Sequence, residues 1–196
     1  MFMLNDMPEQ VSGELLDLLV QCRTETIGHH RHWGFVRGNV RSVLPGRRVV
    51  GTAVTVALPG HDSGVLSHAL SLLREGDILC IDRLGDTHNA CWGGGTTLAA
   101  KLTGAAGVVI DGPSTGSSRF NEFDFPAWTS GTSPVTCQMY GNGGALNVPV
   151  CVGQNGHPTR IRHSGRRQRS CRPAARGCAL SCRDGDRAAE QLPQGV

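Results

Sequence analysis

The chain has 196 residues, 39% of them hydrophobic, and a formal net charge of +3. No apolar run approaches the ~20 residues that a membrane helix needs, which excludes a helical membrane protein. The start, MFMLNDMPEQ, lacks a basic stretch followed by an apolar one, so no signal peptide is expected. These features predict a cytoplasmic protein whose eight cysteines are thiols.

The charge is divided unevenly along the chain. Residues 1–153 hold ten Lys/Arg against thirteen Asp/Glu, a net charge of −3, whereas residues 154–196 hold nine Arg, no Lys and three acids, a net charge of +6. The second segment also lacks aromatic residues and any periodicity, so it cannot bury enough surface to offset its ordering entropy. We therefore predict one domain over 1–153 and a disordered basic tail over 154–196.

The predicted elements alternate between helix and strand. Residues 9–21 have helical spacing of apolar residues, with Ser12 suited to the first turn, and residues 22–47 are loop-rich. Strands are predicted at 49–58, 78–82 and 107–111, helices at 62–73 and within 85–104, and short strands and turns over 126–153. This order predicts an α/β fold with several parallel strands.

A glycine-rich stretch, Gly93-Gly94-Gly95-Thr96, stands just before the second of these helices. Backbone N–H groups at a helix start, with glycines that permit close approach, form a cradle for a carboxylate. The alternative interpretation is a plain glycine-rich turn without a ligand.

The stretch DILCIDRLGDTHNACWGGGTTLAAKLTGAAGVVIDGP (77–113) resembles the core signature of the family of regulator of ribonuclease activity A and 4-hydroxy-4-methyl-2-oxoglutarate aldolase. The flanking VVGTAVTVALPGHDSGVLSHAL and NVPVCVG extend the resemblance over roughly residues 13–153. The family was formerly named for demethylmenaquinone methyltransferase, but no S-adenosylmethionine-type glycine loop follows a first strand here, so that activity is not expected.

The resemblance implies a compact α/β/β/α sandwich that forms homotrimers with sites near subunit interfaces. It implies a class II-type lyase that cleaves or decarboxylates small 2-keto acids with a divalent metal, Mg²⁺ or Mn²⁺. Other members are non-catalytic and bind ribonuclease E, so a ribonuclease partner follows by analogy only. With the resemblance, substrate binding is favoured for Gly93 to Thr96.

One departure from the family pattern affects the chemistry. The family's Arg-Asp pair, which steadies the substrate oxygen and anchors the metal, falls on Thr115 and Gly116. Thr115 can donate a hydrogen bond to the substrate, but Gly116 offers no carboxylate. Candidate substitutes for the metal are Asp111 and Asp86, and Asp86 and His88 are the candidate catalytic residues; the alternatives are a turn-capping aspartate at 111 and an exposed loop histidine at 88.

Two other groups of residues have simpler interpretations. His29, His30 and His32 resemble a metal-binding tract but fall in a predicted loop without paired ligands. Cys91 stands beside Trp92 and is predicted to be packed rather than nucleophilic.

The tail lacks the family's strand–turn–strand ending and last helix. Back-translated and read one base later, it can encode TVIQPGYAIVADDSGVVVLPRED, which is that missing ending. We therefore hypothesise a frameshift, in the gene or its sequencing, near codons 153–155. The rival is a genuine basic tail that contacts RNA phosphates; it lacks aromatic residues for base stacking, so nucleic-acid binding is not expected.

Two functions remain open at this point. The first is a metal-dependent lyase on a small 2-keto acid, by aldol cleavage or oxaloacetate decarboxylation. The second is a non-catalytic member, either a ribonuclease-binding regulator or a degenerate relic, which Thr115 and Gly116 favour.

Overall fold

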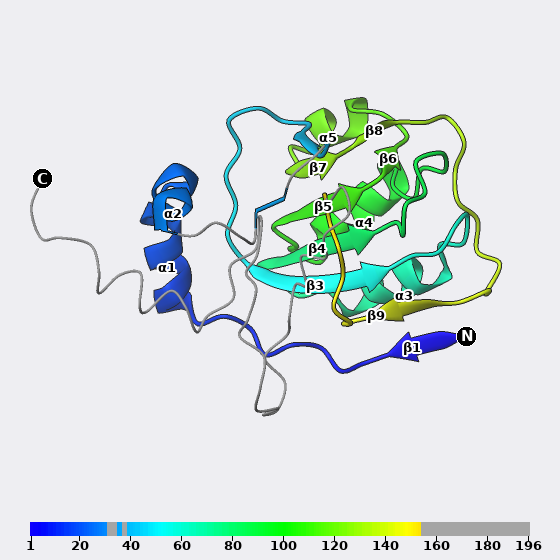
Figure 1. The fold of residues 1–196 in the computed structure, drawn as a ribbon, viewed down its shortest axis with the longest axis horizontal. Coiled ribbons are helices and arrows are strands. Elements are labelled where there is room, and N and C mark those ends of the chain that lie inside the picture. The colour runs from blue at the N-terminus through cyan, green and yellow to red at the C-terminus, as the bar shows by residue number, and fades with distance from the viewer. Residues whose placement is uncertain (31–34, 37–38, 154–196) are drawn as a thin grey trace, which may run out of the picture.

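A computed structural model describes residues 1–30, 35–36 and 39–153 of the chain. The predicted tail over 154–196 and His32 lie outside these residues. Within the described part, seven strands form one sheet (Figure 1). Their order is β1 (Phe2–Leu4), β9 (Gly144–Leu146), β3 (Thr52–Ala57), β4 (Asp77–Asp82), β5 (Gly107–Asp111), β7 (Ala127–Thr129) and β2 (Arg41–Ser42).

The centre of the sheet is parallel, as the alternation of helices and strands predicts. β3 pairs with β4, β4 with β5, and β5 with β7, all in parallel. β9 runs antiparallel to β3, and β2 antiparallel to β7, at the two sides. The side chains of β4 are all buried, which explains why its sequence shows a continuous apolar run rather than alternation.

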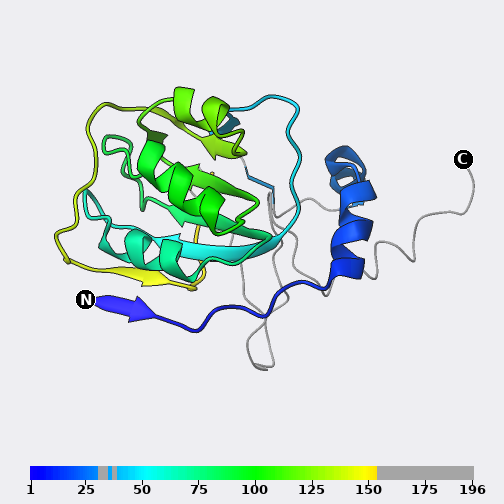
Figure 2. The same cartoon turned by 180° about the vertical axis from the view of Figure 1, so that it is seen from behind.

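Three helices cover one face of the sheet (Figure 2). They are α3 (Gly64–Leu72), α4 (Gly94–Leu102) and α5 (Ser118–Glu122). Their apolar residues join those of the strands in the largest core cluster, in which Leu66, Trp92 and Phe120 are at most 1% exposed. The mixed α/β architecture confirms the predicted fold class.

The chain that follows β9 packs on the opposite face. Val150 and Val152 join Ile78, Cys80 and Val109 in a second apolar cluster. Hydrogen bonds hold this returning segment in place: the Thr55 hydroxyl donates to the Val148 carbonyl at 2.6 Å, and the Cys151 N–H donates to Asp82 Oδ2 at 2.8 Å.

The N-terminal region differs from the sequence prediction in two places. The helix α1 (Gly13–Gln21) begins as predicted, with the Ser12 hydroxyl accepting from the Leu15 N–H. The loop-rich prediction for residues 22–47 missed the helix α2 (Thr24–His30) and the short strand β2 within that range. No residue of α2 is buried, so it has no apolar face that periodicity could reveal.

The strand β1 was not predicted either. All three of its residues are exposed, and it is defined by parallel pairing with β9 rather than by its own pattern.

A second, two-stranded sheet pairs β6 (Pro113–Ser114) with β8 (Gly131–Thr132). No helix in the described part of the chain has the length and apolar character needed to cross a bilayer.

Candidate functional site

The predicted glycine stretch forms the first turn of α4 and lies against Trp92. The Trp92 indole N–H donates to Thr97 Oγ1 at 2.9 Å, and that hydroxyl donates to the Gly93 carbonyl at 2.8 Å. Trp92 is 1% exposed and stacks on Phe125 with ring centroids 6.3 Å apart. The start of the helix is therefore fixed to the core through a buried indole ring.

Thr96 closes the turn locally. Its hydroxyl accepts the Gly93 N–H and donates to the Gly93 carbonyl, both at 2.8 Å. The N–H groups of Gly94, Gly95 and Thr96 belong to the first helical turn, where the helix offers no acceptor, and they have no other acceptor within the described residues. These three N–H groups lie at the positive end of the helix and can donate hydrogen bonds to an anion.

Thr115 lies beside this turn, as a substrate-binding role would require. The Thr115 N–H donates to the Trp92 carbonyl at 2.9 Å. A Cβ built on Gly93 would lie 2.9 Å from Thr115 Oγ1, so glycine at 93 lets the hydroxyl approach the start of α4. The structure thus brings together five residues that the sequence analysis placed in one substrate site: Gly93, Gly94, Gly95, Thr96 and Thr115.

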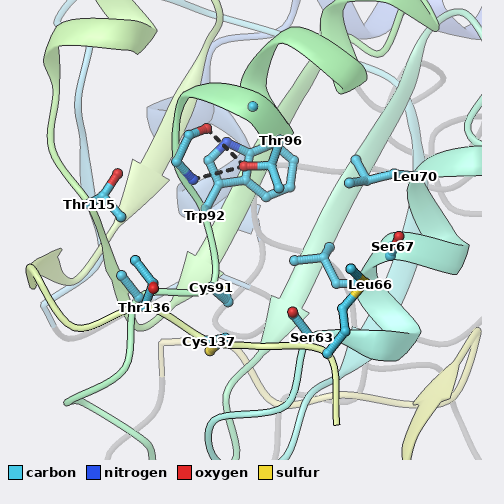
Figure 3. A pocket seen from close by; sticks show the side chains of 14 residues that line it. Ser63, Leu66, Ser67, Leu70, Cys91, Trp92, Thr96, Thr115, Thr136 and Cys137 are labelled. Carbon is cyan, nitrogen blue, oxygen red and sulfur yellow. Dashed lines mark hydrogen bonds between the residues drawn. The ribbon is translucent and has the colours of Figure 1, made fainter. Parts of the chain in front are cut away.

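A cavity of about 350 Å³ opens in front of the glycine turn (Figure 3). Leu66 and Ser63 from the α3 side face Trp92 and Thr96 across it (Figure 3). Its deep wall includes the buried Leu66, Cys91 and Trp92. Its volume lies at the lower end of the roughly 300–1,000 Å³ typical of small-molecule pockets.

Asp86 and His88 lie outside the lining of this cavity. The Asp86 carboxylate accepts the backbone N–H groups of His88 and Asn89, the Asn89 amide, and the Arg83 guanidinium at 2.7 Å. Burial raises its pKa, but these hydrogen bonds and the Arg83 charge outweigh burial and lower it below its ordinary value. Asp86 therefore organises its own loop, and the His88 side chain is exposed.

Arg83 is a residue that the sequence analysis missed. It is fully buried, and its guanidinium donates to the Leu58 and Asn89 carbonyls as well as to Asp86. Its Nη2 also lies 3.3 Å from the sulfur of Cys137, which lines the cavity. In the sequence, only the position of Arg83 directly after the buried strand β4 could have indicated that its guanidinium is buried behind the cavity wall.

Cys91 is packed, as predicted. It is 6% exposed, and burial raises the pKa of its thiol to about 12. At neutral pH it is therefore a thiol rather than a nucleophilic thiolate.

Asp111 is the last residue of β5 and is the register partner of Asp82, the last residue of β4. It accepts a hydrogen bond from the Gly153 backbone, and burial together with the nearby Asp82 charge raises its pKa. It contributes nothing to the cavity lining.

The residues present do not fit a divalent cation at the family's metal position. Gly116, which stands where the resemblance puts the anchoring carboxylate, has a φ of 153° and offers only backbone atoms. Across residues 1–30, 35–36 and 39–153, no three His, Cys, Asp or Glu side chains are grouped to hold a metal ion. His29 and His30 end the exposed helix α2.

Comparison with known proteins places this arrangement in a family. The RraA-like family, described as Aldolase/RraA, matches residues 21–161. The chain belongs to this family. This confirms the resemblance found in the sequence.

Individual relatives of this RraA-like chain have different named activities. A protein of Halalkalibacterium halodurans named "Putative 4-hydroxy-4-methyl-2-oxoglutarate aldolase" is 33% identical over 106 residues, which are 54% of this chain and 50% of that protein. The chain spans about half the length of the curated relatives it matches.

Solved structures give the same fold. Streptomyces coelicolor RraAS2, described as an unusual member of the RNase ES inhibitor RraA protein family, has a TM-score of 0.65 and 27% identity over 74% of this chain and 76% of its own. The RNA-processing inhibitor RraA from Thermus thermophilis has a TM-score of 0.60 and 22% identity over 67% and 80%. The named relatives thus include one called a putative aldolase and one described as a member of an RNase inhibitor family.

Proposed function

We propose that this RraA-like chain binds a small 2-keto acid, with the carboxylate at the start of α4, and is a non-catalytic member of its family. The observation that carries the proposal is the glycine turn at the start of α4, where the residues Gly95 and Thr96, whose N–H groups have no acceptor among the described residues, line the cavity. The carboxylate of the ligand would accept hydrogen bonds from these N–H groups, and the Thr115 hydroxyl would donate a hydrogen bond to the adjacent keto oxygen. Gly116 supports the absence of a metal-dependent lyase step.

The test is a calorimetric titration of the full chain with pyruvate, with and without a chelator. We compare Gly95→Val with Gly13→Val, because a Cβ at either position meets no atom within 4 Å and both residues lie in the first turn of a helix. Gly95→Val should weaken binding at least tenfold, whereas Gly13→Val and the chelator should leave it unchanged. Absent pyruvate binding, or equal weakening by both variants, would reject the proposal.

The second candidate is a metal-dependent lyase acting on a 4-hydroxy-4-methyl-2-oxoglutarate-type substrate or oxaloacetate. The named activity of the Halalkalibacterium relative and the retained glycine turn favour it. It requires pyruvate release that Mg²⁺ or Mn²⁺ stimulates and a chelator abolishes. Under our first proposal the wild-type chain releases no pyruvate. The double variant Thr115→Arg with Gly116→Asp should release pyruvate if this pair is the only part of the lyase site that was lost.

We extend the proposal to the assembly and partner of the chain. By family resemblance the chain forms a homotrimer, so light scattering should give three times the 20.8 kDa chain mass. The inhibitor description of the Streptomyces relative supports a ribonuclease as the partner of a non-catalytic member. Slower RNA cleavage by a ribonuclease E-type enzyme when the chain is added would be the readout.

A further inference from the structure

Two cysteines line the cavity from neighbouring segments of the chain. Ala90 and Thr136 form a parallel bridge, in which the Ala90 N–H donates to the Val135 carbonyl at 2.7 Å and the Cys137 N–H donates to the Ala90 carbonyl at 2.9 Å. Cys91 and Cys137 are the next residues along these two segments. Adjacent strands lie about 4.8 Å apart, which falls within the roughly 4.4–6.8 Å between Cα atoms that a disulfide spans.

The two thiol groups lie on the same side of this bridge. Both residues belong to the lining of one cavity, and Figure 3 shows both below Trp92. The Cys137 sulfur is among the groups whose charge acts on the Cys91 thiol, and the Arg83 guanidinium acts on both thiols. Cys80 belongs instead to the apolar cluster on the opposite face of the sheet.

The surroundings of Cys137 can accommodate a bonded sulfur. Arg83 Nη2 donates to the Cys137 sulfur at 3.3 Å, and a disulfide sulfur keeps the lone pairs that accept this contact. The S–H group donates only over long distances, 3.8 Å to the Gly60 carbonyl and 4.0 Å to the Asn89 carbonyl. Loss of these weak contacts on oxidation therefore costs little.

We propose that Cys91 and Cys137 are a modification site, at which a peroxide converts the two thiols to a reversible disulfide in the wall of the cavity. Cys137 is the less buried thiol and reacts first. The O–O bond of hydrogen peroxide breaks, Cys137 becomes a sulfenic acid, and one water leaves. The Cys91 sulfur then displaces the hydroxyl group as the S–S bond forms, and the Cys91 proton leaves with that hydroxyl as a second water.

The step is balanced, because two electrons pass from the two sulfurs to the two peroxide oxygens. A thiol reductant reverses it by exchange. The reaction should be slow at neutral pH, since burial raises the pKa of both thiols, that of Cys91 to about 12, and the thiolate is the reactive form. The disulfide does not depend on the proposed binding of a 2-keto acid.

The experiment treats the full chain with hydrogen peroxide at mildly alkaline pH, blocks the remaining thiols and maps tryptic peptides by mass spectrometry. Trypsin releases Cys91 in the peptide 84–101 and Cys137 in the peptide 120–160. The expected product is these two peptides joined, lighter than their sum by two hydrogen atoms and separated by a thiol reductant.

The peptide 120–160 also contains Cys151, which provides a matched control. Cys137→Ser should abolish the joined product, whereas Cys151→Ser should leave it unchanged. Absence of the joined peptides from the wild-type chain, or their persistence in Cys137→Ser, would overturn the proposal.

Thermal unfolding shows whether the native fold accommodates the bond. A disulfide that fits the native geometry restrains the unfolded chain between residues 91 and 137, so the oxidised chain should unfold at least about 4 °C above the reduced chain. Cys137→Ser under the same treatment should show no such rise, which separates the disulfide from oxidation elsewhere. Joined peptides without this rise would mean that the bond forms only by distorting the wall, and the proposal would fail.

Discussion

At the residue scale, the site depends on one buried hydroxyl. Thr97 is fully buried and its Oγ1 links two parts of the wall, accepting the Trp92 indole N–H at 2.9 Å and donating to the Gly93 carbonyl at 2.8 Å. A buried indole N–H left without an acceptor has a high free-energy cost, because it cannot reach water. Thr97 therefore holds the tryptophan and the glycine turn in one arrangement.

We predict that Thr97→Val lowers the free energy of unfolding by about 1–3 kcal/mol, the usual cost of leaving a buried polar group unsatisfied. Valine has nearly the same shape as threonine, so the loss would report the hydrogen bonds rather than a cavity. Urea denaturation followed by tryptophan fluorescence measures it. The exposed Thr132 serves as control, since Thr132→Val should change stability by less than about 0.5 kcal/mol. Equal effects at the two positions would contradict this role of Thr97.

At the scale of elements, Asp62 joins the start of α3 to the segment that leads into β9. It is 1% exposed and accepts the N–H groups of Gly64 at 2.9 Å, Tyr140 at 3.2 Å and Asn142. The same segment supports β1, because the N-terminal amine donates to the Asn142 carbonyl at 2.9 Å. One carboxylate thus fixes a helix start and the edge of the sheet together.

The pKa of Asp62 predicts the pH dependence of this contact. Burial raises the pKa, but the backbone hydrogen bonds from Gly64, Asn142, Tyr140 and Gly141 outweigh burial, so the folded-state pKa is below the ordinary value of 3.8. A lowered carboxyl pKa contributes stability that is complete above the unfolded-state pKa and is lost as pH falls through the folded-state pKa.

We predict that Asp62→Asn costs about 1.5–3 kcal/mol of unfolding free energy at pH 7, the range for hydrogen bonds to a charged group. The asparagine variant should also lose less stability than the wild-type chain when the pH falls below about 4. Denaturant midpoints across pH 2–7 would measure both effects. Asp17→Asn on the exposed face of α1 is the control, and a parallel pH profile for wild type and Asp62→Asn would refute the prediction.

At the scale of the whole molecule, the two faces of the sheet are covered differently. The helices α3, α4 and α5 cover one face (Figures 1 and 2). On the other face, Val150 and Val152 close the second core cluster through the chain that returns after β9. Along the sequence, the net charge changes sign after Gly153, where the Arg-rich segment begins.

We predict that a fresh read of the genomic DNA across codons 150–160 finds one extra or missing base relative to the recorded sequence. The reason is the Lys-free, Arg-rich composition of residues 154–196, whose offset reading gives the family's ending. A chain rebuilt in the corrected frame should unfold at a higher temperature than the present chain, because it pairs additional strand edges. An unchanged read would mean that the basic tail is encoded, and the frameshift hypothesis would be wrong.

The sequence by itself determined the central strands and helices and the location of the glycine turn. Apolar runs such as 78–82 and the helical spacing of 9–21 and 62–73 are local signals, because an element that buries one or both faces has apolar residues at the buried positions. β1 and α2 were not predicted because all β1 residues are exposed and α2 buries none, so neither has an apolar pattern of this kind.

Only the tertiary structure decided which residues share a site. The contact of Thr115 with Gly93, the burial of Arg83 behind Cys137, and the placement of Leu66 and Leu70 opposite Trp92 all join segments distant in sequence. It also placed Asp86 in its own loop and Asp111 at the Gly153 backbone, away from the cavity. Spacing along a chain fixes which face of an element a residue occupies, whereas the partner on the next element depends on how the elements pack.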